Sequence, residues 1–352
     1  MKRIIFLGLC LLLLFGCDDT TDLPEKTLTA TEATPTPTIT ESPSIDDDRN
    51  FFISQTGRPM LCAHRGGSVQ NPENTLKAFK YAVDECQADI LESDVWITKD
   101  GHLVLLHDST VLRTSDAVTY LNRSTNLTPR DFTLEELREL NFGANFVAPD
   151  GSKPYVDIVK NITNKEQRKE IIKENEVSIL TLDELFYYFY EKNQDLLFIV
   201  EIKDFGVYGK ASADKINELL TKYPNYSKRL AVGTFNDDVE KYIKSAYPNI
   251  IRGASTSSAN TYVSDVLLKN SVQEVYDFSC LQIPTSYVLS SGNISLISEK
   301  LINVSHEKNI AVQYWTINDE ATMKLLISAK CDAIMTDDPA LFKKVLSEIC
   351  NI

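Results

Sequence analysis

The sequence predicts an α/β protein that folds as a (β/α)8 barrel of the TIM type, with an insertion after the second strand. Eight short apolar runs, of the kind found in strands buried on both faces, lie between residues 60 and 336. Helix-like segments separate most of the runs, and polar residues follow most of them directly. A parallel barrel gathers the C-terminal ends of its strands at one mouth, so these polar residues are expected to meet there. The runs are centred near Leu61, Leu91, Phe198, Val232, Ile251, Leu281, Val312 and Ile334.

The expected elements follow one another from residue 60 onward. The first strand covers residues 60–63, a helix follows at 74–85, and the second strand covers 90–96 and returns through a hairpin at 103–106. Pro339 opens the last helix, because the first position of a helix needs no amide hydrogen. The other helices are expected at residues 182–191, 211–220, 237–246, 264–275, 294–308 and 319–328.

Residues 116–178 interrupt this alternation and are identified as the insertion. Thr133 and Glu136 form a capping-box pattern at a helix start, and residues 165–174 form a second, Lys/Glu-rich helix. The polar composition favours a solvated excursion from the barrel. A lid that gates the substrate is the alternative.

An export signal and a tether precede the barrel. Lys2 and Arg3 stand before an apolar core at residues 4–15, which is too short for an ordinary membrane-spanning helix. Residues 14–17, Leu-Phe-Gly-Cys, resemble a bacterial lipobox. Cys17 is therefore expected to carry lipid and to hold an exported protein at the membrane surface, outside the cytoplasm; a plain secretory signal is the alternative. Residues 18–50, rich in Thr, Pro, Ser and acids, are expected to be a disordered tether, and residues 51–352 form the barrel.

Charge and cysteine usage exclude some classes of function. The formal net charge of −14 argues against a nucleic-acid partner and against a polybasic membrane-binding surface. Beyond the signal and the lipobox, five of the seven cysteines remain, and no C-x-x-C occurs among them. These cysteines are interpreted mainly as buried thiols, although the sequence leaves a bridge between Cys331 and Cys350 open.

The chemistry-bearing residues lie between residues 60 and 108. Glu92 and Asp94 stand two apart on a strand and therefore face the same side, where their charges need a cation between them. Carboxylate oxygens favour Mg²⁺ or Ca²⁺. Arg65 beside a glycine pair suits a phosphate oxygen, and His64 and His107 can supply an acid and a base near neutral pH. A metal, a phosphate clamp and two proton carriers together indicate cleavage of a phosphoester.

Four motifs in this stretch resemble the glycerophosphodiester phosphodiesterase family. They are His64-Arg65-Gly66, Pro72-Glu73-Asn74-Thr75, Glu92-Ser93-Asp94 and His107-Asp108. Later segments also match, namely Glu201-Ile202-Lys203, Trp315-Thr316-Ile317-Asn318 and the stretch from Asp332 to Pro339. The resemblance covers about residues 61–345, apart from the insertion. Residues 87–89, Gln-Ala-Asp, depart from it, since the family usually has a glycine before the alanine.

The resemblance implies a barrel with one metal-dependent site at its mouth. Glu92, Asp94 and Glu201 would hold one divalent cation, Mg²⁺ or Ca²⁺, and His64 and His107 would form the acid–base pair. Arg65, Lys203, Trp315 and Glu73 would contact the substrate. Three alternatives stay open: Lys203 as a structural partner of Glu201, Glu73 as a helix cap, and Trp315 as a core aromatic. His102, in a turn, and His306, on a helix, are expected at the surface.

The expected reaction is hydrolysis of a glycerophosphodiester to an alcohol and glycerol phosphate. Deacylated phospholipids or glycerophosphate polymers are the expected substrates, and the attacking group is either water or a hydroxyl of the substrate's own glycerol. One alternative is a related barrel phospholipase that cleaves intact lipids, either sphingomyelinase D-like or phosphoinositide-specific. Such an enzyme needs an exposed apolar rim, which the polar insertion does not supply. A non-enzymatic solute-binding lipoprotein is the other alternative.

Overall fold

In the part of the chain that the structure describes, eight parallel strands form a nearly closed barrel. They are β1 (Met60–Ala63), β2 (Ile90–Ile97), β4 (Leu197–Ile202), β5 (Leu230–Gly233), β6 (Ile251–Arg252), β7 (Cys280–Ile283), β10 (Ala311–Tyr314) and β11 (Ala333–Thr336). Their order around the sheet is β6-β5-β4-β2-β1-β11-β10-β7, and a parallel bridge between Gly253 and Cys280 joins its two ends. The predicted (β/α)8 barrel is confirmed.

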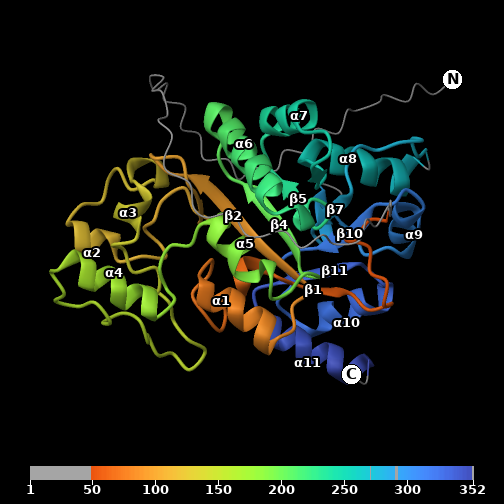
Figure 1. The fold of residues 1–352 in the computed structure, drawn as a ribbon. Coiled ribbons are helices and arrows are strands. Elements are labelled where there is room, and N and C mark those ends of the chain that lie inside the picture. The colour runs from red at the N-terminus through yellow and green to blue at the C-terminus, as the bar shows by residue number, and fades with distance from the viewer. Residues whose placement is uncertain (1–48, 270, 290–291, 351–352) are drawn as a thin grey trace. The chain divides into compact units, whose positions relative to one another are not determined.

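This computed structural model describes residues 49–269, 271–289 and 292–350 (Figure 1). The predicted export signal, Cys17 and nearly all of the predicted tether lie outside the described residues. Within the described residues, no helix is both long and apolar enough to cross a bilayer.

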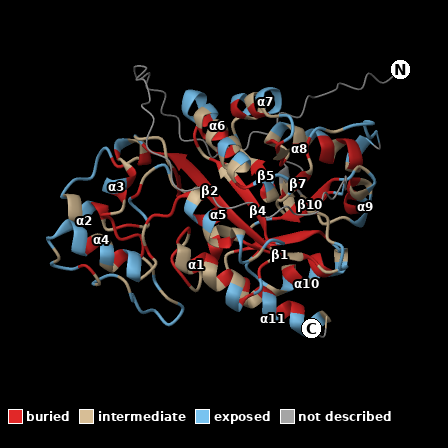
Figure 2. Ribbon diagram, in the orientation of Figure 1, coloured by how far each residue is buried: buried red, intermediate tan, exposed pale blue. Residues whose placement is uncertain are grey.

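Helices flank the barrel strands and turn their apolar sides toward them (Figure 2). On the barrel these are α1 (Leu76–Lys80), which continues as a π-helical turn at Tyr81–Glu85, α5 (Leu182–Tyr190), α6 (Gly206–Lys222), α7 (Asp237–Ala246), α8 (Thr256–Ser264), α9 (Glu299–Glu307), α10 (Glu320–Ala329) and α11 (Pro339–Cys350). The short strand β3 (Leu103–Leu105) pairs antiparallel with β2 and forms the predicted hairpin.

Three of the helix starts predicted from the sequence are wrong. The helix expected at residues 211–220 begins at Gly206. The helix expected at residues 264–275 begins earlier, at Thr256, because Ser255 caps it by accepting a hydrogen bond from the Ser258 amide. The helix expected at residues 294–308 begins at Glu299, after the cap Ser298. The preceding residues form a hairpin of β8 (Ser286–Leu289) and β9 (Gly292–Ser295), and the predicted helix wrongly includes the last two residues of β9.

The barrel interior toward the N-terminal ends of the strands is apolar. Its cluster consists of Cys62, Ile90, Leu197, Ile199, Ala231, Cys280, Ala311, Ala333 and Met335, together with Phe52 from the segment before β1. Phe52 is fully buried at the N-terminal ends of the strands, where Asn50 donates hydrogen bonds to the carbonyl oxygens of Ser279 (2.8 Å) and Asn309 (2.9 Å). Phe52 therefore covers the apolar interior at the N-terminal ends of the strands.

The segment identified as the insertion forms a small packed unit beside the barrel (Figure 1). It contains α2 (Ala117–Leu121), α3 (Leu134–Leu137) and α4 (Lys165–Glu174), and the predicted capping box at Thr133 and Glu136 is present. Arg168 is buried and donates to the carbonyl oxygens of Glu139 (2.6 Å) and Val159 (3.2 Å). Apolar side chains such as Phe132 and Leu137 pack with Trp96 of β2, so this segment has a core that its polar composition does not suggest.

The cysteines match the prediction of buried thiols. Cys62, Cys86, Cys280 and Cys331 are buried and unbridged. Cys350 is half-buried and also unbridged, so the bridge to Cys331 that the sequence left open is not formed.

Candidate active site

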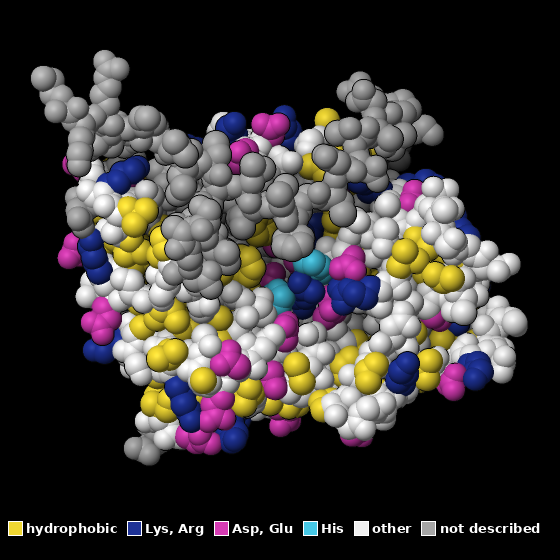
Figure 3. Space-filling model, turned by 180° about the vertical axis from the view of Figure 1, so that it is seen from behind, with side chains coloured by type: hydrophobic (Ala, Val, Ile, Leu, Met, Phe, Trp, Pro, Cys, Tyr) yellow, Lys and Arg dark blue, Asp and Glu magenta, His cyan; other side chains and the backbone are white. Residues whose placement is uncertain are grey.

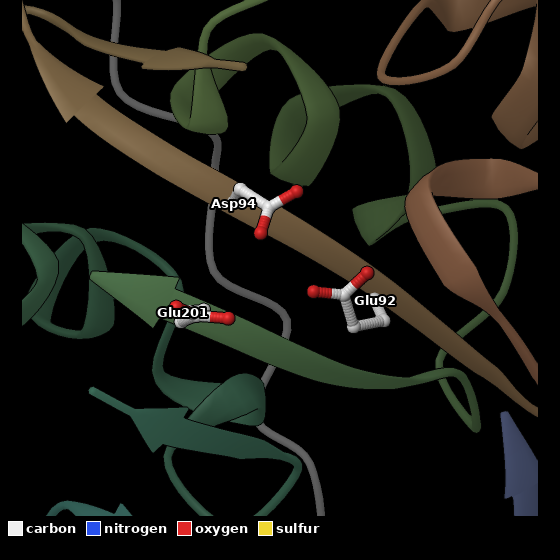
Figure 4. A group of neighbouring side chains, drawn as sticks. All are labelled: Glu92, Asp94 and Glu201. Atoms are coloured by element: carbon white, nitrogen blue, oxygen red, sulfur yellow. The ribbon is translucent and has the colours of Figure 1, made fainter. Parts of the chain in front are cut away.

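Three carboxylates meet at the C-terminal ends of β2 and β4. Glu92 and Asp94 are on β2 and Glu201 is on the neighbouring β4, where Asp94 and Glu201 are direct register partners. One ligand oxygen from each lies within 4.8 Å of the others, and the three side chains point into one shared space (Figure 4). Glu92 and Asp94 are buried. The strand alternation read from the sequence therefore places both β2 carboxylates on the inner face of the barrel.

Two cations from the same motifs partly neutralise these carboxylates. Lys203 Nζ lies 2.8 Å from Glu201 Oε1 and 3.2 Å from Asp94 Oδ1, so it pairs with both. Arg65 Nε lies 3.3 Å from Asp94 Oδ2, and the Arg65 backbone amide donates to Glu92 Oε2 at 2.9 Å. Lys203 is therefore a partner of Glu201, as the alternative in the sequence analysis proposed, and it also contacts Asp94 of the site.

The charge balance of the cluster suits a divalent cation. Burial and the neighbouring charge of Asp94 raise the pKa of Glu92 to about 8, and burial also raises the pKa of Glu201. Burial works in the same direction on Asp94, but the charges of Lys203 and Arg65 together lower its pKa. Three carboxylates thus face two basic side chains, and a hard cation held by their oxygens would remove the excess negative charge.

His64 is held by an aspartate, Asp337, that directly follows the last strand, β11. Its Nδ1 lies 2.6 Å from Asp337 Oδ1, and its Nε2 lies 3.9 Å from Glu92 Oε2. Asn318 supports this aspartate by donating to Asp337 Oδ2 at 2.7 Å. Burial lowers the pKa of His64, but the charge of Glu92 and the bond to Asp337 outweigh burial, so the net shift is upward.

The glycines after Arg65 bring this loop close to the rest of the barrel. Gly67 has φ +92°, and a Cβ there would lie 2.6 Å from the ring of Pro339, at the start of α11. A Cβ at Gly66 would lie 2.9 Å from the side chain of Ala78 in α1. Only glycines fit so closely, which explains why the motif places them directly after His64 and Arg65.

His107 is held in the same way from the other side of the site. Its Nδ1 lies 2.8 Å from Asp108 Oδ1, and its charge acts on two of the clustered carboxyls: it helps to lower the pKa of Asp94 and offsets part of the rise in the pKa of Glu201. The bonds to His107 and to Arg113 hold the pKa of Asp108 far below its usual value. In both histidines the aspartate occupies Nδ1, so Nε2 is the nitrogen left for proton transfer.

Glu73 and Trp315 occupy different positions around the site. Glu73 does not cap α1, because Thr75 does so by accepting a hydrogen bond from the Ala78 amide. Instead Glu73 pairs with Arg65 at 3.2 Å and with Arg113. Trp315 follows β10 at the barrel mouth and is 36% exposed, so it is not a core aromatic.

Four residues that contact the predicted pair or its supports were not among the predicted site residues: Asp108, Arg113, Asn318 and Asp337. Asp108, Asn318 and Asp337 lie inside motifs quoted above. Their place in those motifs is the signal that the sequence offers for them. The side chains of the other two histidines contact aspartates outside the carboxylate cluster, namely Asp100 for His102 and Asp332 for His306. Both side chains are partly exposed, 40% for His102 and 35% for His306, as predicted for surface positions. His306 in addition bonds the buried Asp332 at 2.9 Å, a partner that the sequence did not predict.

Histidine, basic and acidic side chains gather together on the face of the molecule seen in Figure 3. The sites of acid–base chemistry, of phosphate neutralisation and of metal binding predicted from the sequence are therefore parts of one constellation. Residues 64 and 337, which are far apart in the sequence, meet there because β1 and β11 are neighbours in the closed barrel.

Comparison with known proteins agrees with this geometry. The model of the "Glycerophosphoryl diester phosphodiesterase family" matches residues 64–341. A "Glycerophosphodiester phosphodiesterase" of Caldanaerobacter subterraneus subsp. tengcongensis is 28% identical over 80% of this chain and 95% of its own. Another, from Bacillus subtilis, is 23% identical over 82% of this chain and 86% of its own.

Solved structures show the same fold. A glycerophosphoryl diester phosphodiesterase domain from Mycobacterium tuberculosis superposes with a TM-score of 0.61 at 17% identity, and covers 82% of this chain and 98% of its own. A phosphodiesterase from Oleispira antarctica, solved with the product sn-glycerol-3-phosphate, superposes with a TM-score of 0.57 at 20% identity, and covers 82% and 97%. Since the family model spans most of the chain and its motifs carry the constellation described above, this chain belongs to the glycerophosphoryl diester phosphodiesterase family.

Proposed function

We propose that this enzyme hydrolyses glycerophosphodiesters to an alcohol and glycerol phosphate, with His64 and His107 as its acid–base pair and with one Mg²⁺ or Ca²⁺ held by Glu92, Asp94 and Glu201. One observation carries the proposal. Two histidines, each fixed at Nδ1 by an aspartate, stand at the same barrel mouth as three clustered carboxylates, of which Glu92 and Asp94 are buried.

The division of labour follows from the contacts. When bound, the cation supplies Lewis-acid neutralisation of the phosphate charge. Arg65 and Lys203 lie beside the cluster and neutralise the remaining phosphate oxygens. The aspartate at each Nδ1 fixes the tautomer and the ring orientation, so that each Nε2 is aimed for proton transfer. One histidine accepts the proton of the attacking group, either water or the substrate's own glycerol hydroxyl, and the other donates a proton to the departing alcohol oxygen. If the glycerol hydroxyl attacks, water then opens the cyclic phosphodiester to give glycerol phosphate.

The test is to identify the products. The enzyme would be incubated with glycerophosphocholine, glycerophosphoethanolamine or an intact phospholipid, with and without metal, and the reaction followed by ³¹P NMR. We expect a phosphomonoester signal of glycerol phosphate from the two deacylated substrates, in the presence of metal. Absence of any phosphomonoester under all conditions would refute the proposal.

A specific observation favours a second activity, the cleavage of intact or partly deacylated lipids. Phe205 (49% exposed), Val207 (70%) and Phe235 (62%) lie just beyond the C-terminal ends of β4 and β5. Because β4 and β5 are adjacent, these side chains border the same side of the mouth as Glu201. Exposed apolar groups clustered at an active-site mouth are suited to contact a hydrocarbon chain. The rim comes from these two strand ends and not from the insertion.

This second activity predicts a selective effect of polar rim substitutions. Phe205→Ser together with Phe235→Ser should lower kcat/KM for a lysophospholipid by roughly tenfold, since each side chain then offers less apolar contact area. Hydrolysis of glycerophosphocholine, which has no acyl chain, should change less than about twofold. Wild-type inactivity on lysophospholipid, or an equal loss on both substrates, would exclude a hydrocarbon-binding role for the rim.

We further propose that the protein is exported and lipid-anchored through Cys17. Support comes from the sequence alone: the basic start, the short apolar core, the lipobox-like residues 14–17 and the polar stretch that follows. Radiolabelled palmitate fed to the producing cells should label the wild-type protein but not Cys17→Ser. Equal labelling of the two proteins would contradict the assignment.

A further inference from the structure

We propose that Arg113 is a positioning residue that couples the two halves of the active site. It sits in the loop between His107 and the insertion, and its hydrogen bonds go to Glu73 and Asp108, which are not among the three candidate metal ligands. The inference rests on the proposed function, because it assigns Arg113 an effect on the same hydrolysis.

The geometry of the Arg113 guanidinium is the first reason. It donates to both oxygens of Glu73, each at 2.7 Å, and to both oxygens of Asp108, at 2.7 Å and 3.0 Å. A guanidinium fork that grips two carboxylates fixes their relative orientation, which a lysine ammonium cannot do. The two carboxylates come from different loops, one after β1 and one after β3.

What lies behind each carboxylate is the second reason. Asp108 holds Nδ1 of His107, and Glu73 holds Nη1 of Arg65 at 3.2 Å. A continuous chain of charge-assisted bonds therefore runs from His107 through Arg113 to Arg65. Through it, one side chain sets the orientation both of a proposed proton carrier and of a proposed phosphate ligand.

The contrast with His64 is the third reason. The aspartate behind His64 directly follows the barrel strand β11 and is supported by the neutral amide of Asn318, in the loop after β10. The aspartate behind His107 lies on a loop outside the barrel, and its support is Arg113. The insertion holds this loop, because Asn145 Nδ2 donates to the carbonyl oxygens of Arg113 (3.1 Å) and Ser115 (2.8 Å). The insertion thus contributes to the site by fixing the segment that carries Arg113.

Exposure separates this role from a stabilising one. The Arg113 side chain is 48% exposed, and exposed ion pairs contribute little to stability. Removing it should therefore change orientation within the site far more than the free energy of unfolding. Glu73, by contrast, is almost buried, so without Arg113 its carboxylate would turn toward Arg65 and compete with the phosphate.

The experiment compares Arg113→Met, Asp108→Asn and the double variant with wild type, using glycerophosphocholine and saturating metal. Arg113→Met should lower kcat by about ten- to hundredfold and raise KM severalfold. Asp108→Asn should lower kcat similarly without the rise in KM, because it leaves Glu73 in place. The kcat of the double variant should equal that of the single variant with the lower kcat, since both changes act through His107.

Arg138→Met is the matched control. Arg138 is 35% exposed and pairs with Glu184 at 2.6 Å, away from the site, so its kcat and KM should stay at wild-type values. Metal affinity measured by calorimetry and the melting temperature should be unchanged in Arg113→Met. Effects on kcat that multiply in the double variant, wild-type kinetics of Arg113→Met, or a fall in its melting temperature or metal affinity would each overturn the proposal. A wild-type enzyme without hydrolysis would instead refute the proposed function itself.

Discussion

Replacing His64 or His107 by alanine is expected to lower kcat by about a thousandfold, because each removes one of the two proton transfers that the reaction requires. An aspartate occupies Nδ1 of each histidine, Asp337 for His64 and Asp108 for His107, so Nε2 is the nitrogen that transfers the proton. Alanine has no group that could replace it. The measurement is steady-state hydrolysis of glycerophosphocholine, with the melting temperature as a check on folding.

His102→Ala is the control for these variants. His102 is exposed in its turn and lies outside the site, so its removal should leave kcat unchanged. If His64→Ala or His107→Ala keeps more than about a tenth of wild-type kcat while folded, that histidine is not one of the proton carriers.

Removal of the metal is expected to lower kcat at least as much as the loss of either histidine. Chelation should abolish turnover and added Mg²⁺ or Ca²⁺ should restore it, because a Lewis acid accounts for several kcal/mol of charge stabilisation in such sites. Glu92→Gln should be inactive even with metal, since it removes one of the three ligand carboxylates. Full activity after thorough chelation would contradict the metal assignment.

The same variant separates loss of metal from loss of fold. With chelator present, the wild-type protein should lose stability as pH rises from 4.5 toward 8, because the folded state binds the Glu92 proton more tightly than the unfolded state does. Glu92→Gln lacks this group, so its melting temperature in chelator should be less sensitive to pH in that range. Metal should then raise the melting temperature of wild type but not of Glu92→Gln. Glu320→Gln, on the surface helix α10, is the control and should behave as wild type.

Much of the fold could be predicted because each barrel strand carries its own local signal. Continuous apolar runs such as residues 196–200 identify strands buried on both faces, and all eight such runs became barrel strands. The errors fell where local signals conflict. Ser255 and its small polar neighbours hid the start of α8, and the alternating residues around Ile294 satisfied a helical as well as a strand pattern.

The site divides in the same way. Glu92 and Asp94 could be paired from sequence because strand geometry puts residues two apart on one face, whatever the rest of the chain does. The partners of His64 and Glu73 could not, because Asp337 and Arg113 lie in other loops and no local period connects them. Likewise, Phe205 and Phe235 form a rim only because β4 and β5 are neighbours.

The sequence by itself therefore determined the barrel, the family and the ligand-type residues, since these depend on strand spacing and on motifs of a few adjacent residues. Only the tertiary structure decided which aspartate orients each histidine, that Arg113 joins Asp108 to Glu73, and where apolar groups border the mouth. The physical reason is that the pairing of strands brings loops from separate parts of the chain together at the mouth of the barrel. Hydrogen bonding between β1 and β11 brings the two ends of the domain together, and the contacts made across that junction have no counterpart in the order of residues along the chain.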